Sequence, residues 1–401
     1  MQKYVGVLAL FLAFSLLASC GGAAVSPSLE PSPPPTPVPT PTPSPAEPSV
    51  EEEIPVMTVF EPSADNVKQL GRTSLTDGVL WCAHSGTGAE FTVTGSSASV
   101  TLLGDNAAGT DNQARIAILL DGERVIDEML DAREKVIPIF EGDAEREVVV
   151  TIVKLSESAM STVGIGGIEV TGSIAPTPQK PKLIEFVGDS ITCGYGVDDE
   201  DRNHHFSTST EDVTKTYAYL AAAELGADYS MVSFSGYGVI SGYTSAGVLN
   251  EAQTVPKYYE KLGFSYGDGF PAAQTDWDFS KREPDMIVVN LGTNDDSYCG
   301  GDADRAAEYT AGYIEFLKQI RAKNPGARIV CSLGIMGDRL YAAMEAAVAG
   351  YTAETGDINV ETLKFPVQQA SDGYAADWHP TFATHAKAAA VLVSALTFEG
   401  V

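Results

Sequence analysis

The sequence has few basic residues, few cysteines and no long apolar run. Its 401 residues include 25 Lys and Arg against 54 Asp and Glu, which gives a net charge of −29. A chain this acidic is repelled by nucleic acid phosphates and anionic lipid head groups, because both are bound mainly through Lys and Arg. We therefore expect no nucleic-acid partner. The charge favours an uncharged partner such as a neutral polysaccharide.

The five cysteines form no CxxC pair or other zinc-like spacing, and the sequence contains no HExxH motif. The acidic residues 198–201, followed by His204 and His205, are the remaining candidate for a metal site. A charged surface loop is the simpler interpretation, so we predict neither a metal nor a cofactor. The four cysteines after Cys20 are compatible with disulfide bridges in an exported protein and equally with buried thiols.

The N-terminus has the pattern of a signal peptide. Lys3 precedes an apolar run at residues 5–17, which is shorter than the roughly 20 apolar residues of a membrane-spanning helix. Residues 17–20, Leu-Ala-Ser-Cys, resemble a bacterial lipobox, in which the cysteine is lipidated. We predict a lipoprotein signal peptide over residues 1–20, with export to the bacterial cell surface and a membrane anchor on Cys20 alone. Ordinary secretory cleavage nearby is the alternative.

The segment after the signal peptide is rich in proline. Residues 26–49 contain 11 of the 23 prolines of the chain, interleaved with Ser and Thr. Such a segment stays extended, at about 3.1 Å per residue, and can hold the following domain away from a surface. We predict a linker over residues 21–55.

Short β-rich runs separated by turn residues follow, over residues 56–175. Asp121 and Gly122 between two of these runs indicate a hairpin, because both turn positions favour positive φ. Several strands without a long helical pattern predict a β-sandwich jelly-roll domain. The predicted strands are residues 90–94, 99–103, 115–120, 124–129, 136–140 and 147–153.

Apolar strands alternating with amphipathic helices occupy residues 181–401. Continuous apolar strands between helices predict an α/β domain with a parallel sheet covered on both faces. We expect strands at residues 183–187, 229–234, 285–291 and 329–333. The predicted helices are residues 214–225, 304–323, 340–352 and the segment after Pro380.

Polar residues with catalytic potential follow several of these elements. Ser190 leaves the first strand of the predicted parallel sheet, at the edge where active groups collect. The tripeptide at residues 188–190 is also good turn chemistry, so it carries little weight alone. Gly236 follows the second strand, Asn294 follows the third, and His379 precedes the last helix. We expect all four to converge on one edge.

Acyl-transfer chemistry assigns a role to each residue. Ser190 needs a base, which His379 can supply, and Asp377 is the nearest side chain that could fix the imidazole tautomer. The oxyanion needs fixed donors, available from the backbone N–H groups of Ser190 and Gly236 and from the Asn294 amide.

These four blocks resemble the SGNH (GDSL-type) hydrolase superfamily, which is named for its Ser, Gly, Asn and His. Further stretches, together with the β-rich region, look like carbohydrate esterase family 2; they are residues 188–196, 205–208, 291–295 and 373–380. That resemblance implies an N-terminal jelly roll, a flavodoxin-like SGNH domain and removal of O-acetyl groups from xylan, mannan or related plant polysaccharides without a metal. The superfamily places its acid three residues before the histidine, where this chain has Ala376. A backbone carbonyl could therefore orient His379 in place of Asp377.

Aromatic residues flank the catalytic blocks and could stack on sugars or simply pack; they are Tyr237, Trp277, Tyr298 and Trp378. We predict a serine esterase, with acetylated polysaccharide as its partner. A lipase or thioesterase on the same fold is a nearby alternative, and an inactive carbohydrate-binding surface protein is the other. The sequence shows no heptads or repeats, so we predict a monomer.

Overall fold

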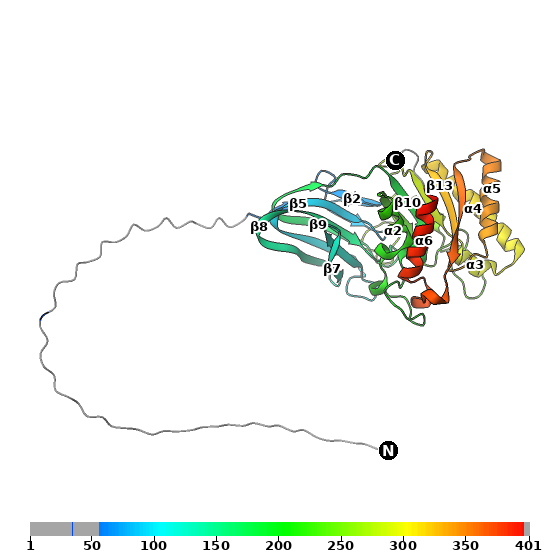
Figure 1. The fold of residues 1–401 in the computed structure, drawn as a ribbon, viewed down its shortest axis with the longest axis horizontal. Coiled ribbons are helices and arrows are strands. Elements are labelled where there is room, and N and C mark those ends of the chain that lie inside the picture. The colour runs from blue at the N-terminus through cyan, green and yellow to red at the C-terminus, as the bar shows by residue number, and fades with distance from the viewer. Residues whose placement is uncertain (1–33, 35–55, 397–401) are drawn as a thin grey trace, which may run out of the picture. The chain divides into compact units, whose positions relative to one another are not determined.

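The computed structural model describes residue 34 and residues 56–396, and the latter belong to one compact unit. The predicted signal peptide, Cys20 and almost all of the predicted linker lie outside the described residues. Figure 1 shows two parts side by side, a region of blue to green strands and a region of green to red helices and strands. We call them the β domain and the α/β domain.

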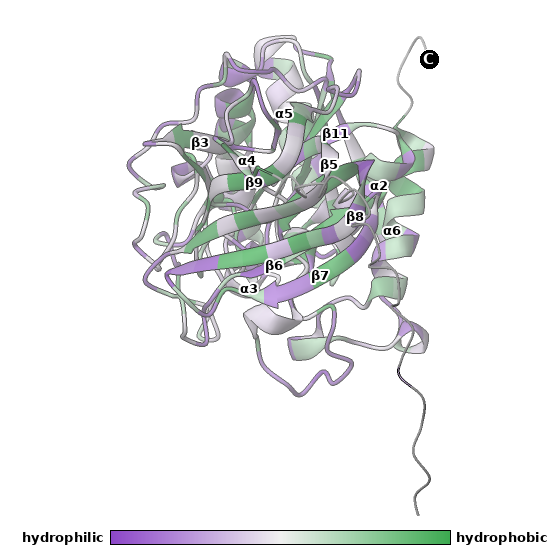
Figure 2. Ribbon diagram, turned by 90° about the vertical axis from the view of Figure 1, so that its left-hand side faces the viewer, coloured by the Kyte–Doolittle hydropathy of each residue, from purple (hydrophilic) through white to green (hydrophobic). Residues whose placement is uncertain are grey.

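The β domain consists of antiparallel strands between Thr58 and Pro176. Their main order is β3-β4-β9-β5-β8-β6-β7, with β1 paired to β9 and β2 paired to β5. Figure 2 shows apolar stretches along these strands and more hydrophilic loops around them. The strands are β1 Thr58–Phe60, β2 Lys68–Leu70, β3 Thr73–Thr76, β4 Val79–Cys82, β5 Gly88–Gly104, β6 Arg115–Leu120, β7 Glu123–Met129, β8 Glu134–Lys154 and β9 Val163–Pro176.

Two predicted strand pairs are single long strands. The runs at 90–94 and 99–103 are both part of β5, and those at 136–140 and 147–153 are both part of β8. The sequence between Gly95 and Ser97 looks like a turn, but the structure has a register shift there. A bulge bends a strand without ending it, so β5 continues through these residues. The hairpin prediction is confirmed, since Asp121 and Gly122 have φ angles of 49° and 85°.

The α/β domain contains a parallel sheet in the order β11-β10-β12-β13-β14. This order is that of a flavodoxin-like doubly wound sheet, so the predicted fold class is confirmed. Helices α2 and α6 cover one face, and α4 and α5 cover the other. The bounds are β10 Leu183–Gly188, α1 Ser190–Cys193, α2 Tyr217–Glu224, β11 Asp228–Ser233, β12 Met286–Asn290, α3 Thr293–Cys299, α4 Ala303–Lys323, β13 Arg328–Ile335, α5 Tyr341–Thr355, β14 Val360–Val367 and α6 Phe382–Ala395.

Two elements of this domain escape the sequence pattern. Strand β14 is half exposed and contains Pro366, as edge strands can, so it lacks the apolar run of a central strand. Helix α3 is short and rich in polar residues. None of the helices within residues 56–396 has both the length and the apolarity that crossing a membrane requires. The described cysteines are all buried, unpaired thiols: Cys82, Cys193, Cys299 and Cys331.

Candidate active site

Ser190 opens a short helix at the carboxyl end of β10, an inner strand of the parallel sheet. The Asp189 side chain caps this helix by accepting a hydrogen bond from the Ile191 N–H at 3.0 Å. Burial raises the pKa of Asp189 to about 7. The helix ends at Gly194, whose φ of 89° lies in the left-handed region. Because the first N–H groups of a helix have no acceptor within it, the Ser190 amide is available to another partner.

His379 meets Ser190 from the other end of the domain. Its Nε2 lies 2.9 Å from Ser190 Oγ, although the two residues are 189 positions apart in sequence. Its Nδ1 lies 3.1 Å from the Ala376 carbonyl oxygen. Burial lowers the pKa of His379 to about 4, so the ring is neutral at neutral pH. A neutral ring that donates Nδ1–H to the carbonyl leaves Nε2 free to accept the Ser190 proton.

The turn before His379 has an unusual backbone. Asp377 and Trp378 both have positive φ, at 48° and 65°, in the region that non-glycine residues rarely adopt. This turn brings the Ala376 carbonyl back onto the His379 ring. The strained backbone therefore builds the contact that holds the imidazole.

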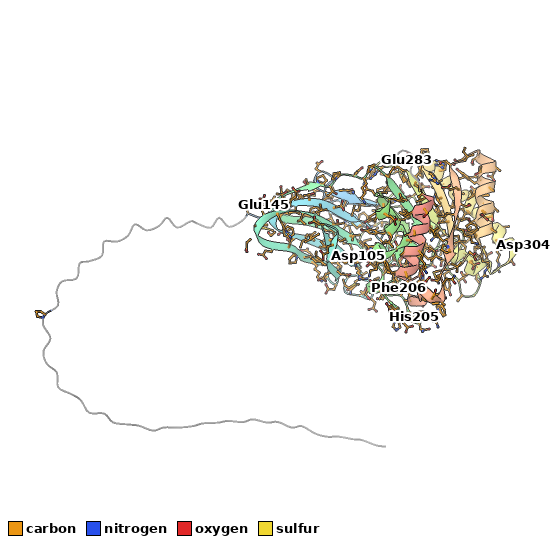
Figure 3. All side chains as sticks on the ribbon, viewed as in Figure 1. Asp105, Glu145, His205, Phe206, Glu283 and Asp304 are labelled. Carbon is orange, nitrogen blue, oxygen red and sulfur yellow. The ribbon has the colours of Figure 1, made fainter. Side chains whose placement is uncertain are left out.

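Asp377 directs its carboxylate away from the histidine ring. It accepts hydrogen bonds from Tyr195 Oη at 2.5 Å and from the Phe206 N–H at 3.2 Å. His205 Nδ1 lies 2.8 Å from its other oxygen. Figure 3 shows His205 and Phe206 beside the C-terminal, orange-to-red part of the chain. In this geometry the partner of His379 Nδ1 is the Ala376 carbonyl and not the Asp377 carboxylate, because Asp377 stands two residues before the histidine, on the far side of the turn.

Tyr195 links Asp377 to His379. Its ring stacks on the imidazole, with centroids 3.8 Å apart and planes 17° from parallel. The sequence offers no signal for this residue, because its position depends on how the loop after α1 folds back over the site. The contacts make Tyr195 and Asp377 a support for the outer face of His379.

Gly236 lies in the loop after β11, and Asn294 lies in the first turn of helix α3, which follows β12. Gly236 has a φ of 81°, which explains the glycine, although nothing lies within 4 Å of where a Cβ would be. Asn294 is buried on α3, where its Nδ2 donates to the Tyr237 carbonyl at 2.9 Å and lies 3.3 Å from Asp189 Oδ2. Both line one cavity of about 730 Å³ together with Ser190 and His379.

Asp295 is a buried support of this cavity that the sequence reasoning missed. Its carboxylate accepts backbone hydrogen bonds from Val239, Ile240 and Ser241 at 2.8–3.0 Å. Burial raises its pKa to about 6, although those bonds act in the opposite direction. Asp295 therefore ties helix α3 to the segment that follows Gly236.

The aromatic candidates occupy different places. Trp378 lines the cavity at Ser190, where it is 49% exposed, and the Arg202 guanidinium lies 4.2 Å from its ring centre. Tyr237 and Tyr298 are buried, and the hydroxyl of Tyr298 donates to Glu308. Trp277 lines a separate cavity. Sequence proximity to a catalytic block thus does not place an aromatic ring on the cavity wall.

Tyr243, which the sequence reasoning did not consider, is 61% exposed and lines the cavity. The acidic segment 198–201 contacts neighbouring basic side chains. Asp198 pairs with Arg115 at 2.7 Å, and Asp199 lies 3.0 Å from His204. These contacts fit the interpretation of the segment as a charged surface loop.

A model of the GDSL-like lipase/acylhydrolase family matches residues 186–387. A model of the carbohydrate esterase 2 N-terminal domain matches residues 69–178. The chain therefore belongs to the GDSL-like lipase/acylhydrolase family. It is a hydrolase, which agrees with its flavodoxin-like fold and with the contact between Ser190 and His379. More particularly, it is a member of carbohydrate esterase family 2, as the sequence resemblance predicted.

Known relatives agree with this assignment. The cellulase/esterase CelE of Acetivibrio thermocellus is 31% identical over 76% of this chain, which spans only 36% of that protein. An acetylxylan esterase/glucomannan deacetylase of Cellvibrio japonicus is 28% identical over 83% of this chain and 89% of its own length. A family two carbohydrate esterase from Clostridium thermocellum, solved with cellohexaose, is 28% identical, with a TM-score of 0.72 over 82% of this chain and 97% of its own.

Proposed function

We propose that this esterase removes O-acetyl groups from plant cell-wall polysaccharides, such as xylan, mannan or their oligosaccharides, through an acetyl-enzyme. The observation that supports this most strongly is the 2.9 Å contact between Ser190 Oγ and His379 Nε2 in an open cavity. Relatives named for acetylxylan and glucomannan deacetylation support the substrate class. The net charge of −29 suits a neutral polymer.

In the proposed reaction, Ser190 is the nucleophile and His379 the general base and acid. Ser190 Oγ attacks the acetyl carbonyl while its proton moves to His379 Nε2. The tetrahedral intermediate then collapses, and His379 donates the proton to the departing sugar oxygen. A water molecule, deprotonated by His379, attacks the acetyl-enzyme next, and acetate leaves as Ser190 regains its proton.

The developing oxyanion needs fixed hydrogen-bond donors. We assign them to the backbone N–H groups of Ser190 and Gly236 and to the Asn294 amide. The 2.9 Å bond to the Tyr237 carbonyl orients that amide. Its second hydrogen makes a weaker 3.3 Å bond to Asp189, and the reacting oxygen would replace that acceptor.

We assign the orientation of His379 to the Ala376 carbonyl, which makes the catalytic unit a Ser–His dyad. Asp377 makes its side-chain contact with Tyr195, which stacks on the ring, and acts on His379 itself through its charge. The exposed rings of Trp378 and Tyr243 are candidates for stacking on sugar rings at the cavity mouth, because sugars present apolar faces to aromatic side chains.

We further propose that the protein is exported as a monomer and held at the bacterial surface by lipid on Cys20. The proline-rich linker up to residue 55 would carry a jelly roll over residues 56–175 and the esterase domain over 181–401. Labelling with radioactive palmitate, compared with a Cys20→Ala variant, tests the anchor. Incorporation that survives the substitution would contradict it.

The function is tested by acetate release from acetylated xylan and acetylated glucomannan. We expect release by the full chain and a loss of at least about 10⁴-fold in Ser190→Ala, since the nucleophile is gone. Circular dichroism of the variant controls for folding. Hydrolysis of p-nitrophenyl acetate without release from either polymer would indicate another acyl substrate, as in a lipase or thioesterase. Binding to the polymers without any hydrolysis would indicate a carbohydrate-binding protein.

A further inference from the structure

Glu157 belongs to the β domain but contacts the catalytic loops. It follows strand β8, is fully buried, and accepts a hydrogen bond from the Ser235 N–H at 2.7 Å through Oε2. The same oxygen lies 3.7 Å from Sγ of Cys193, the last residue of the nucleophile helix α1. One carboxylate of the β domain thus reaches both the loop that contains Gly236 and the helix that carries Ser190.

The contact with Ser235 fixes the peptide group that matters for catalysis. The Gly236 N–H belongs to the peptide between Ser235 and Gly236. On one side of it, Glu157 holds the Ser235 N–H, and on the other, the Gly236 carbonyl accepts from the Tyr243 N–H at 2.8 Å. Glycine restrains its own dihedral angles little, so these two contacts, together with the 3.3 Å turn bond from the Tyr237 N–H to the Phe234 carbonyl, hold the Gly236 N–H in its direction.

Glu157 is itself held by buried partners. Its backbone N–H donates to Glu211 Oε2 at 2.8 Å, and the Lys154 ammonium donates to the carbonyls of Ser156 and Glu157 at 2.6 and 2.7 Å. Burial raises the pKa of both Glu157 and Glu211. Burying two carboxyl groups and an ammonium is costly, so packing alone does not account for the cluster.

Glu157, Cys193 and Glu211 are also close enough to hold a metal ion, with ligand atoms within 4.8 Å of one another. Lys154 already supplies a positive charge to this cluster. Burial raises the pKa of the Cys193 thiol well above its usual range, which keeps it protonated and a poor ligand. The cluster is therefore better explained by the two loops that it contacts than by a metal.

We propose that Glu157 is a positioning residue of the esterase reaction, which holds the Ser235–Gly236 peptide so that its N–H meets the oxyanion. This inference rests on the oxyanion role proposed above for Gly236. It makes the β domain a part of the catalytic machinery, because the domain supplies the contact that shapes the oxyanion hole.

The test compares two substitutions of similar size in the full chain. Glu157→Met removes the acceptor and leaves Lys154 and Glu211 in place in the buried cluster. Glu157→Gln keeps a carbonyl oxygen that can accept from the Ser235 N–H. We expect Glu157→Met to lower kcat on p-nitrophenyl acetate by about 10- to 100-fold at nearly constant KM, because small misplacements of catalytic groups cost this much. Glu157→Gln should stay within about threefold of the wild type.

A matched control is Ser158→Ala. Ser158 is the next residue, and its hydroxyl donates across the same domain interface to the Phe264 carbonyl at 2.8 Å. Ser158→Ala should lower the thermal unfolding midpoint without changing kcat. Hydrogen exchange of the peptide that contains residues 233–238 gives a readout independent of activity. The exchange should be faster in Glu157→Met than in the wild type and unchanged in Glu157→Gln.

The proposal is overturned if folded Glu157→Met keeps the wild-type kcat, if Glu157→Gln loses as much as Glu157→Met, or if Ser158→Ala loses kcat equally. If Glu157→Met is not recovered folded, Glu157→Asp replaces it, because its shorter side chain withdraws the acceptor. Failure of the proposed serine-esterase function is distinguishable, since Ser190→Ala would then retain activity in the same assay whatever Glu157 does.

Discussion

Two of the places where the β domain meets the α/β domain differ in how their charges are satisfied. At the amino ends of the parallel strands, Arg72 makes a bidentate pair with Glu185, at 2.9 and 3.1 Å, and Lys68 pairs with Asp228 at 2.6 Å. Near the carboxyl ends, Glu157 leaves Oε1 without a partner among the described residues. The charges at the amino ends are paired with each other, whereas the Glu157 carboxylate near the carboxyl ends contacts the catalytic loops. By the proposal above, one interface stabilises the fold at one end and positions the catalytic loops at the other.

The largest effect that would sharpen this comparison is on stability. Arg72→Met leaves the Glu185 carboxylate buried without its partner, so we expect the free energy of unfolding to fall by about 3–5 kcal/mol. Urea denaturation measures the loss, and kcat of the folded variant should not change. The double variant Arg72→Met/Glu185→Leu should regain most of the stability. A drop in kcat for folded Arg72→Met would erase the distinction between the two places.

The next effect concerns the carboxyl end. Asn294→Ala removes a side-chain donor from the proposed oxyanion hole, so kcat should fall by about 10²–10³-fold. Steady-state kinetics on p-nitrophenyl acetate measures this change. The thermal unfolding midpoint of Asn294→Ala should fall much less than that of Arg72→Met. An unchanged kcat would exclude the amide from the oxyanion hole.

A smaller effect is expected on the outer side of the histidine. Asp377→Asn keeps the side-chain shape, and the carbonyl of Ala376 still holds His379 Nδ1, so kcat should fall by less than about tenfold. A carboxylate that belonged to a catalytic triad would cost about 10⁴-fold. Tyr195→Phe, which removes only the hydroxyl that meets Asp377, is the matched control. A loss near 10⁴-fold in Asp377→Asn would replace the dyad with a triad.

The smallest effect concerns the pH profile of kcat/KM, whose acid limb should lie at lower pH than that of a free histidine. Burial lowers the pKa of His379 from 6.5 to about 4, and only the neutral ring accepts the Ser190 proton. We therefore expect kcat/KM to stay on its plateau as pH falls below 6.5 and to drop near pH 4. The same shift makes His379 favour folding above pH 6.5, a contribution that is lost as pH falls toward 4. A limb near pH 6.5 would mean that the ring is solvated in the working enzyme.

Much of this protein could be predicted without coordinates. Apolar runs that end in small polar residues identify β10, β11 and β12, and the residues just after them include Ser190, Gly236 and Asn294. Parallel strands place their carboxyl ends at one sheet edge, so the convergence of these residues follows from chain order alone. The Asp121–Gly122 turn was equally readable, because two consecutive positive φ angles restrict the residue types.

Other features depended on contacts between distant segments. Residues 95–97 look like a turn, and only pairing with β8 and β9 decides that β5 continues through a bulge. The sequence predicted that the Asp377 carboxylate would contact His379, because the two residues are close in sequence. The left-handed turn at residues 377–378 instead places the Ala376 carbonyl beside His379 Nδ1. Backbone carbonyls leave no mark in the sequence, so such a partner is visible only in the fold.

The sequence by itself indicated the signal-peptide pattern, the two-part fold class and the proposed nucleophile and base, because these follow from local periodicity and from residue chemistry at strand ends. The tertiary structure alone decided which groups hold that machinery in place. Glu157 and Ser235 are 78 residues apart, and Asp295 is 54 residues from Ser241. Hydrogen bonds of this kind join segments that only the tertiary packing brings together, and no periodicity along the chain encodes them.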